Sequence, residues 1–506
     1  MKKRILCALL TVLLIAGMFT GCGKKEETSS GIPKISYFGS DAGRILTDDN
    51  PVIAEIERIN NIDLDLNLVA DSERMSKFSI LAASGDIPDV VSLLRFDIFH
   101  FIPQGIIQEI TDEMLEEYAP TLAKRKEAEK EYWDLMKYDG KTYAIPSIDV
   151  AGKQLLVARK DWMNNVGITK NPETLDEYVE MLRAFTFDDP DGNGKNDTYG
   201  ITTLDSVSGD YLASFTHIFG AFGIQPQQER IIDGKVYADS ISEGYKEALK
   251  VLAKLYQEGV IDPESFIHKA EQAKQKIVQG KTGSFCAGWH QVPTIMTTYE
   301  MAKLQPGVEW TMLDAPKGAD GGYGYKVSSP LSGTNAITTA CENPEVYLKL
   351  REWLTTEEAW NLTHYGIKGE HYTEIGKRTE LGEKLYQEKK LDILAGWTDT
   401  VETKFENWRV NDAERYPFVV KAAEEKLFKS DMYGIVTDTY NTLFPDLKKI
   451  EEEWFVRFLT GEADVEKDWN AYVKQWKQKG GVEILESMVE EYNKRNGTKL
   501  VVGEKK

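Results

Sequence analysis

Nine consecutive residues near the middle of the chain, 189–197, have the composition and spacing of a metal-binding loop. Oxygen-bearing side chains occupy relative positions 1, 3, 5 and 9, and glycines at positions 4 and 6 permit the positive φ that tight winding needs. Alternate side chains of such a loop converge on one point, and carboxylate, amide and backbone carbonyl oxygens suit Ca²⁺. The spacing therefore predicts a structural Ca²⁺ site with these ligands: Asp189, Asp191, Asn193, the backbone carbonyl of Lys195, and Asp197.

The exit of this loop differs from that of an EF-hand. An EF-hand carries a glutamate at position 12, where Gly200 stands in this chain. No nucleophile, paired acid or histidine lies beside the loop, so we expect the ion to have a structural role and not a catalytic one. Asp, Asn and Gly also fill polar turns, so a hairpin turn without metal is the alternative interpretation.

The elements that would position the loop follow an alternation of strands and helices. Thr174 and Glu177 have the spacing of a capping box, which predicts a helix running through Leu182 toward the loop. Residues 153–158 before it form an apolar run typical of a strand. The loop is therefore expected to leave the end of a helix that packs on a sheet.

The first hundred residues show the same rhythm. We expect strands at 34–38, 62–68 and 87–94, with helices at 51–60 and 71–84, the second ending at Gly85. Strand, helix and strand in succession indicate an α/β lobe.

The second half of the chain adds two more strands and then becomes helical. A helix over 245–256 ends at Gly259, and strand-like runs recur at 282–289 and 334–340. The last hundred residues predict long amphipathic helices around 451–459, 467–476 and 482–494. The acidic run 451–453 is expected to lie on a solvated helix face.

The N-terminus has the layout of a secretory signal. Three basic residues precede an apolar stretch shorter than the roughly 20 residues that span a bilayer, and Thr20, Gly21 and Cys22 follow. Small residues before a cysteine resemble the lipobox of bacterial lipoproteins, although Phe19 stands where leucine is usual. We therefore expect a signal peptide at 1–21, a diacylated Cys22 and a tether at 22–32. A transmembrane anchor or ordinary secretion is the alternative.

Length and charge limit the classes of function. The chain has 506 residues, enough for roughly two to four domains. Its formal net charge is −21, and loss of the three basic signal residues makes it −24, which argues against nucleic acid as a partner. Beyond the signal and Cys22, the two cysteines at 286 and 341 lie in apolar runs and are expected to be buried free thiols, and nothing indicates a zinc site.

Seven short motifs occur in an order and spacing that resemble the family 1 extracellular solute-binding proteins, over nearly the whole mature chain. The branch that it resembles most contains the LplA-type lipoproteins and the alginate-oligosaccharide-binding proteins. The motifs are SGDIPDVV at 84–91, YAIP at 143–146, RKDW at 159–162, DTYG at 197–200, YGIKGEHY at 365–372, LTGE at 459–462 and WNAYV at 469–473.

The resemblance implies an α/β, two-lobe fold like that of periplasmic binding proteins, with an interlobe cleft and a helix-rich C-terminal region. Lobe 1 would comprise 33–150 and about 322–395, and lobe 2 would comprise 151–321 and about 396–506. It also implies a calcium loop in the second lobe. Alginate-binding relatives carry an acidic residue directly after the last aspartate of that loop. Thr198 stands here, which leaves the coordination number open.

Ligand-binding residues in such folds lie on loops after strands and at lobe crossings. Sugar sites pair aromatic rings with polar side chains, so Trp289 with His290, directly after a strand, is the first candidate for a stacking platform. Trp408 with Arg409, in a polar stretch, is the second. Most other tryptophans are expected to be packing residues.

Two further pairs of residues follow predicted strands and are candidates for the same cleft. Ser40 and Asp41 follow the first strand, and Arg95 and Phe96 follow the 87–94 run.

These observations predict an extracytoplasmic, membrane-anchored solute-binding lipoprotein without catalytic residues. We expect a monomer that captures an oligosaccharide and delivers it to the permease subunits of an ABC importer. Three alternatives stay open: an extracellular glycoside hydrolase, which needs a positioned pair of carboxyl groups, a partner of a membrane sensor, and a binding protein for a non-sugar ligand such as a peptide.

Overall fold

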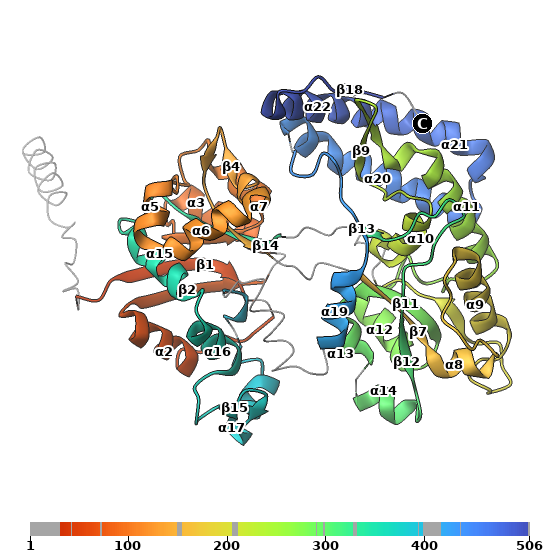
Figure 1. Cartoon of the computed structure of the whole chain (residues 1–506), viewed down its shortest axis with the longest axis horizontal. Coiled ribbons are helices and arrows are strands. Elements are labelled where there is room, and N and C mark those ends of the chain that lie inside the picture. Colours follow the sequence, from red (N-terminus) through yellow and green to blue (C-terminus); the bar gives the residue numbers. More distant parts are fainter. Residues whose placement is uncertain are drawn as a thin grey trace, which may run out of the picture.

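The structure is a computed structural model that describes residues 31–41, 43–70, 73–148, 154–204, 211–289, 291–296, 299–326, 331–392, 394–397, 416–435 and 437–503. Two α/β lobes make up this part of the chain (Figure 1). Within the described ranges, no helix combines the length and the apolar character needed to cross a bilayer.

A five-stranded sheet forms the centre of lobe 1. Its strand order is β2-β1-β3-β14-β6, in which β1 is parallel to β2 and β3, and β14 is antiparallel to β3 and β6. The predicted strands at 34–38, 62–68, 87–94 and 334–340 are confirmed as four of these five. The strands are β2 (Asp63–Val69), β1 (Lys34–Ser40), β3 (Val90–Leu93), β14 (Leu331–Ile337) and β6 (Ile145–Ile148).

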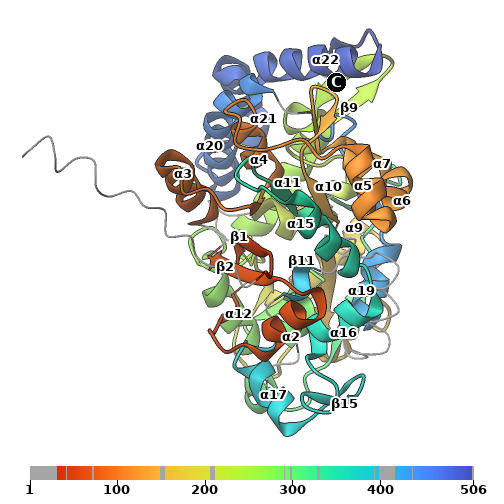
Figure 2. The same cartoon turned by 90° about the vertical axis from the view of Figure 1, so that its left-hand side faces the viewer.

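Helices cover both faces of this sheet (Figure 2). One face packs against α2 (Pro51–Asn60), α5 (Asp112–Tyr118), α6 (Pro120–Ala128), α7 (Lys130–Asp134), α15 (Pro344–Trp353) and α16 (Glu357–Tyr365). The other packs against α3 (Arg74–Ser84) and α4 (Arg95–Phe101). The predicted helix at 51–60 is confirmed, and its start is capped by the Asn50 side chain, which accepts from the Val52 and Ile53 amides.

A four-stranded sheet in the order β12-β7-β11-β8 forms the centre of lobe 2. Leu156 and Ala158 face one core cluster, whereas Leu155 and Val157 face another, because successive side chains of a strand point to opposite sides. The predicted strands at 153–158 and 282–289 are confirmed. The four strands are β12 (Trp310–Leu313), β7 (Gln154–Arg159), β11 (Thr282–Gly288) and β8 (Tyr199–Ile201).

The two faces of this second sheet carry different sets of helices. The core cluster on the first face includes residues of α8 (Lys160–Asn165), α9 (Leu175–Phe187), α10 (Thr216–Ala221), α11 (Glu243–Gln257), α20 (Asp438–Thr460), α21 (Val465–Trp476) and α22 (Val482–Asn496). The second face packs against α12 (Ala270–Val278), α13 (Gln291–Met296), α14 (Tyr299–Leu304) and α19 (Tyr416–Glu424). The helix-rich C-terminal region predicted from the sequence is α20, α21 and α22.

Short elements complete the two lobes. A three-stranded sheet pairs β9 (Glu229–Ile232), β10 (Lys235–Ala238) and β18 (Val501–Val502), and three two-stranded ribbons pair β4 (Lys137–Tyr138) with β5 (Lys141–Thr142), β13 (Tyr325–Lys326) with β17 (Leu427–Phe428), and β15 (Tyr372–Glu374) with β16 (Lys377–Arg378). A further α-helix is α17 (Glu380–Gln387).

The chain passes between the lobes three times: between Ile148 and Gln154, between Lys326 and Leu331, and between Trp397 and Tyr416. The strands of the first sheet therefore come from two separate parts of the sequence. The domain boundaries proposed from the sequence near 150, 321 and 395 stay a prediction.

The acidic run at 451–453 corrects one expectation. Glu451 is only 4% exposed, and its carboxylate accepts hydrogen bonds from the Trp476 indole at 2.8 Å and the Gln227 side-chain amide at 3.1 Å. Burial raises the pKa of Glu451 above its ordinary value. The prediction of a solvated face was wrong for this residue because successive helical positions point in different directions, so three adjacent acids cannot all face water.

Candidate functional site

The edge of the first sheet from which the chain crosses to lobe 2 brings several strand ends together. Because β1 and β3 are parallel, Ser40 and Leu94 lie at the same edge. The antiparallel register pairs Ile148 with Leu331, so β6 ends and β14 begins there too. We call this edge, defined by Ser40, Leu94, Ile148 and Leu331, the first crossing edge.

Four of the predicted ligand-binding residues have their backbone at the first crossing edge. Asp41 donates its amide to the Val69 carbonyl at 2.9 Å, and its Oδ1 accepts from the Gly43 amide at 2.8 Å. These two bonds hold the half-buried Asp41 at the end of β1. Arg95 and Phe96 begin α4 directly after Leu94, and their side chains lie outside the described part of the structure. Ligand contact by these residues stays a prediction.

The matching edge of the second sheet is where the chain enters lobe 2. Gln154, the first residue of β7, pairs with Gly288, the last residue of β11. The next residue is Trp289, so the chain crossing and the first candidate aromatic lie together. We call this edge, defined by Gln154, Gly288 and Trp289, the second crossing edge.

Trp289 is buried in this conformation. Only 6% of its surface is exposed, and it belongs to a core cluster that includes Leu155 and Phe285 of the sheet and Val292 of α13. The structure thus places it at the expected edge, but with the surroundings of a packing residue. Its role as a stacking platform stays a prediction. Three other predicted ligand residues lie outside the described residues: His290, Trp408 and Arg409.

Two exposed apolar side chains in the described parts of the lobes were not singled out from the sequence. Leu94, at the first crossing edge, is 53% exposed, and Ile267 is 78% exposed. Ile267 lies on the 262–268 loop, which begins where Ile261 bridges to Ile201 at the end of β8. Leu94 could have been found by the same strand-end rule that selected Arg95, whereas no local signal marked Ile267.

The loop that carries Ile267 is held by a buried carboxylate. Asp262 is fully buried and accepts from Lys276 Nζ at 2.7 and 2.9 Å, from Thr202 Oγ1 at 3.1 Å and from the Glu264 amide at 3.0 Å. His268, at the other end of the loop, bonds through Nε2 to the Thr203 carbonyl at 2.8 Å. Bonds at both ends therefore fix the backbone that presents Ile267.

The predicted metal loop lies where expected, directly after α9. The capping box of Thr174 and Glu177 is confirmed at the start of that helix. The Asn193 side-chain amide donates to Asp191 at 2.8 Å and to Asp197 at 3.1 Å, while Asp189 accepts from the Asn193 and Gly194 amides at 3.0 Å each. The sequence prediction that these side chains converge agrees with this geometry.

The electrostatics of the loop reflect closely placed carboxylates. Burial raises the pKa of Asp191, and the nearby charges of Asp197 and Asp189 act in the same direction. By contrast, a hydrogen bond from Lys281 at 2.6 Å lowers the pKa of Asp197. Lys281 therefore supplies part of the positive charge that these acids need.

The residues of the loop fit Ca²⁺ in their chemistry but are occupied with other partners. Three carboxylates and one amide oxygen are the donors that Ca²⁺ prefers. Within the described ranges, however, no group of three or more His, Cys, Asp or Glu side chains has the arrangement of a metal site. Hydrogen bonds to N–H groups and to Lys281 take up the carboxylate oxygens that an ion would use.

Two curated relatives match almost the whole chain. It is 25% identical to the lipoprotein LipO of Bacillus subtilis over 96% of this chain and 98% of that protein. It is 24% identical to the polygalacturonan/rhamnogalacturonan-binding protein YtcQ of the same organism over 97% of this chain and 99% of that protein.

Solved structures show the same two-lobe fold. The alginate-binding protein AlgQ2, solved without calcium ion, matches 92% of this chain and 99% of its own, with a TM-score of 0.65 at 20% identity. An EF-hand mutant of the Streptococcus pneumoniae ABC-transporter substrate-binding protein FusA, in complex with fructo-nystose, matches the same shares with a TM-score of 0.70 at 18% identity.

The family itself is identified by a match over more than half of the sequence. The model of the bacterial extracellular solute-binding proteins covers residues 46–359, which include the second crossing edge, the 189–197 loop and three of the four residues that define the first crossing edge: Leu94, Ile148 and Leu331. The chain therefore belongs to the family of bacterial extracellular solute-binding proteins.

Proposed function

We propose that this protein captures an oligosaccharide between the first and second crossing edges and delivers it to an ABC importer, acting as a monomer. The observation that carries the proposal is the end-to-end similarity to YtcQ, whose name states that it binds polygalacturonan and rhamnogalacturonan. FusA of Streptococcus pneumoniae, 28% identical over 43% of this chain, is named as a fructooligosaccharide transporter component. The two crossing edges supply polar and apolar groups of the kind that bind sugars.

A ligand screen tests this function and one variant tests the site. Once a screen of plant and algal oligosaccharides by thermal shift finds a stabilising ligand, Asp41→Ala should weaken its binding roughly tenfold or more. The reason is that a hydrogen bond to a charged group contributes about 1.5–3 kcal/mol. Isothermal titration calorimetry measures the affinity.

Asp63→Ala is the matched control, because Asp63 is an exposed acid far from Asp41. It begins β2 and lies opposite Lys34 in the strand register, at the other end of β1. It should bind the ligand as the unaltered protein does. Equal affinities for both variants and the unaltered protein would remove Asp41 from the site, and a screen without any stabilising saccharide would count against the function.

The proposal is for binding without hydrolysis. A glycoside hydrolase needs two carboxyl groups on either side of the scissile bond, about 5–9.5 Å apart. Incubating the purified protein with the oligosaccharide that it binds should leave the concentration of reducing ends unchanged. Release of reducing ends in proportion to protein would show that the protein is an enzyme.

We also propose that Cys22 carries a diacyl anchor on the extracytoplasmic face of the membrane. The similarity to a named lipoprotein supports this proposal, as does the signal layout before the cysteine. Mass spectrometry of protein extracted from membranes should find an acylated N-terminal cysteine, with palmitate among its chains, and Cys22→Ser should release the protein from the membrane fraction. A mature chain that begins at another residue would contradict the proposal.

A calcium ion in the 189–197 loop is the last element of the proposal. The oxygen donors of the loop support this proposal. Two of the solved relatives support it as well, since AlgQ2 was solved without calcium ion and FusA was solved as an EF-hand mutant. When bound, the ion would neutralise the loop carboxylates and tie the end of α9 to the start of β8. Asp189, Asp191, Asn193, Lys195 and Asp197 would hold it.

A further inference from the structure

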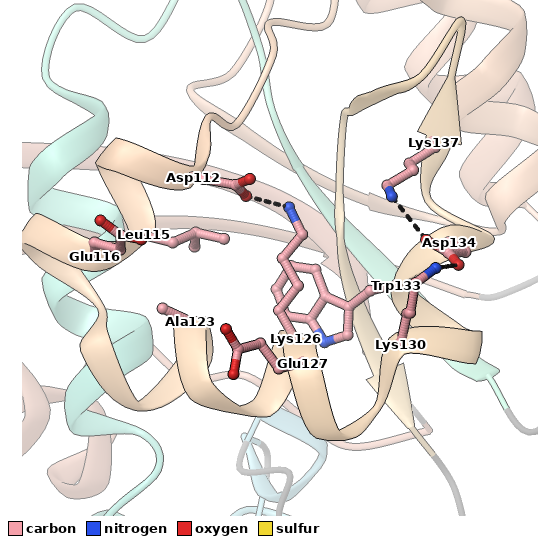
Figure 3. Close-up of a pocket in the computed structure, with 10 residues that line it drawn as sticks. All are labelled: Asp112, Leu115, Glu116, Ala123, Lys126, Glu127, Lys130, Trp133, Asp134 and Lys137. Carbon is pink, nitrogen blue, oxygen red and sulfur yellow. Dashed lines mark hydrogen bonds and ion pairs between the residues drawn. The ribbon is translucent and has the colours of Figure 1, made fainter.

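A pocket lies on lobe 1, away from the first crossing edge. It has a volume of about 230 Å³ and is formed by α5, α6, α7 and the start of β4 (Figure 3). Trp133, one of its lining residues, packs in the same cluster as Ile145 and Ile337. Ile337 ends β14 at the edge opposite to Leu331, so this pocket is separate from the crossing edges.

The indole of Trp133 has an unused hydrogen-bond donor. Trp133 is 2% exposed, and its N–H has no acceptor among the described residues. Buried N–H groups in proteins almost always have a partner, so an unpaired one at a pocket is a sign of a missing acceptor. The side chain that covers the ring is Lys126, whose Nζ lies 5.8 Å from the ring centroid and whose stem passes in front of the indole in Figure 3. The Lys126 ammonium group is held by Asp112 at 2.5 Å and by Thr142 Oγ1 at 3.1 Å, so a ligand reaches the N–H by displacing this side chain from these two partners.

The charges around the pocket select the chemistry of a ligand. Three ammonium groups and four carboxylates line it, and the ammonium groups are bonded to two of these carboxylates, Asp112 and Asp134. An anion would therefore meet unpaired carboxylates, and a cation could not accept a hydrogen bond from the Trp133 N–H. Two of the carboxylates, those of Glu116 and Glu127, have no hydrogen-bond or ion-pair partner among the described residues. The charged lining residues are Lys126, Lys130, Lys137, Asp112, Glu116, Glu127 and Asp134.

Hydroxyl groups match this combination of one unpaired donor, the Trp133 N–H, and two unpaired acceptors, the Glu116 and Glu127 carboxylates. One hydroxyl can accept from the Trp133 N–H or from an ammonium group and donate to Glu116 or Glu127 at the same time. The volume is below the roughly 300–1,000 Å³ of sites for drug-sized ligands, so the pocket suits one sugar ring and not a chain of rings. We propose that this pocket is an accessory site for a single ring of a neutral saccharide.

The Trp133 indole gives a direct readout of this site. In the full chain labelled with ¹⁵N-tryptophan, the Trp133 indole resonance is assigned by its loss in Trp133→Phe. Titration with glucose, galactose or fructose should shift that proton downfield in a saturable way for at least one of the three. Glu116→Ala and Glu127→Ala should each weaken this binding about tenfold.

Glu117→Ala is the matched control, because Glu117 is an exposed neighbour on α5 that does not line the pocket. It should leave the titration unchanged, and so should Asp41→Ala, which acts on the other site. The proposal is overturned if no neutral sugar moves the resonance, if galacturonate alone moves it, or if Glu117→Ala weakens binding as much as Glu116→Ala. A shift in Glu127→Ala without sugar would show that Glu127 is itself the acceptor, which also overturns it.

Discussion

Chelation of calcium is expected to lower the free energy of unfolding of this protein by about 2.7 kcal/mol. This value applies when the free Ca²⁺ concentration before chelation is about 100 times the dissociation constant of the loop. The physical reason is that an ion bound only to the folded state stabilises that state by mass action. Without the ion, three carboxylates stay close together at the end of α9, and burial with mutual repulsion raises the pKa of Asp191. Thermal unfolding with and without chelator measures the change.

Variants of the loop separate calcium binding from other effects of a chelator. The double variant Asp191→Ala with Asp197→Ala should unfold at the same temperature with and without chelator. Asp188→Asn, which changes the exposed acid next to the loop, should keep the full response. Identical melting curves of the unaltered protein, after metal analysis has verified removal, would eliminate the site.

Lys281 provides a test that depends on the structure. Its ammonium bonds to Asp197 at 2.6 Å, so it competes with an ion for that carboxylate. Lys281→Ala should therefore bind Ca²⁺ more tightly than the unaltered protein, as measured by calorimetry. Weaker binding would mean that Lys281 positions Asp197 for the ion.

Trp289→Ala will cost about 3–5 kcal/mol of unfolding free energy, because it removes a buried indole and leaves a cavity. The side chain is 6% exposed and packs against residues of β7, β11 and α13. Denaturant unfolding followed by circular dichroism measures the loss. A change of less than about 1 kcal/mol would show that the indole is not needed for packing and would favour the prediction that it stacks on a sugar.

Trp408→Ala is the companion variant. If Trp408 is the platform, its loss should weaken oligosaccharide binding roughly tenfold to a hundredfold, because burying such an apolar face contributes on the order of 1–3 kcal/mol. The stability of the fold should stay the same. A Trp289→Ala protein that remains folded and binds normally, beside a Trp408→Ala protein that does not bind, would assign the aromatic contact to Trp408.

Local patterns in the sequence were sufficient to predict most of the elements. The helix at 51–60, the capping box at Thr174 and the strand at 282–289 were found because caps, apolar periodicity and glycine stops act over a few residues. The strand-end rule also put Ser40 and Arg95 on one edge of a sheet. It succeeded because β1 and β3 are parallel neighbours, so their carboxyl ends meet.

Burial at the ends of those elements could not be predicted in the same way. Trp289 follows a strand, as a ligand-binding residue would, but its surroundings include Leu155 and Ala422, which are distant in the sequence. Ile267 is exposed because Asp262 and His268 fix its loop from both ends, and neither bond has a local signature.

By itself, then, the sequence determined the α/β elements, the loop of oxygen donors and the family, since each depends on residue types at short spacing. Only the tertiary structure decided which side chains at the crossing edges are buried, that Glu451 faces the Trp476 indole, and that Trp133 has an unpaired donor at a pocket. These features arise where separate segments meet, and the free energy of each depends on neighbours that the local sequence does not contain.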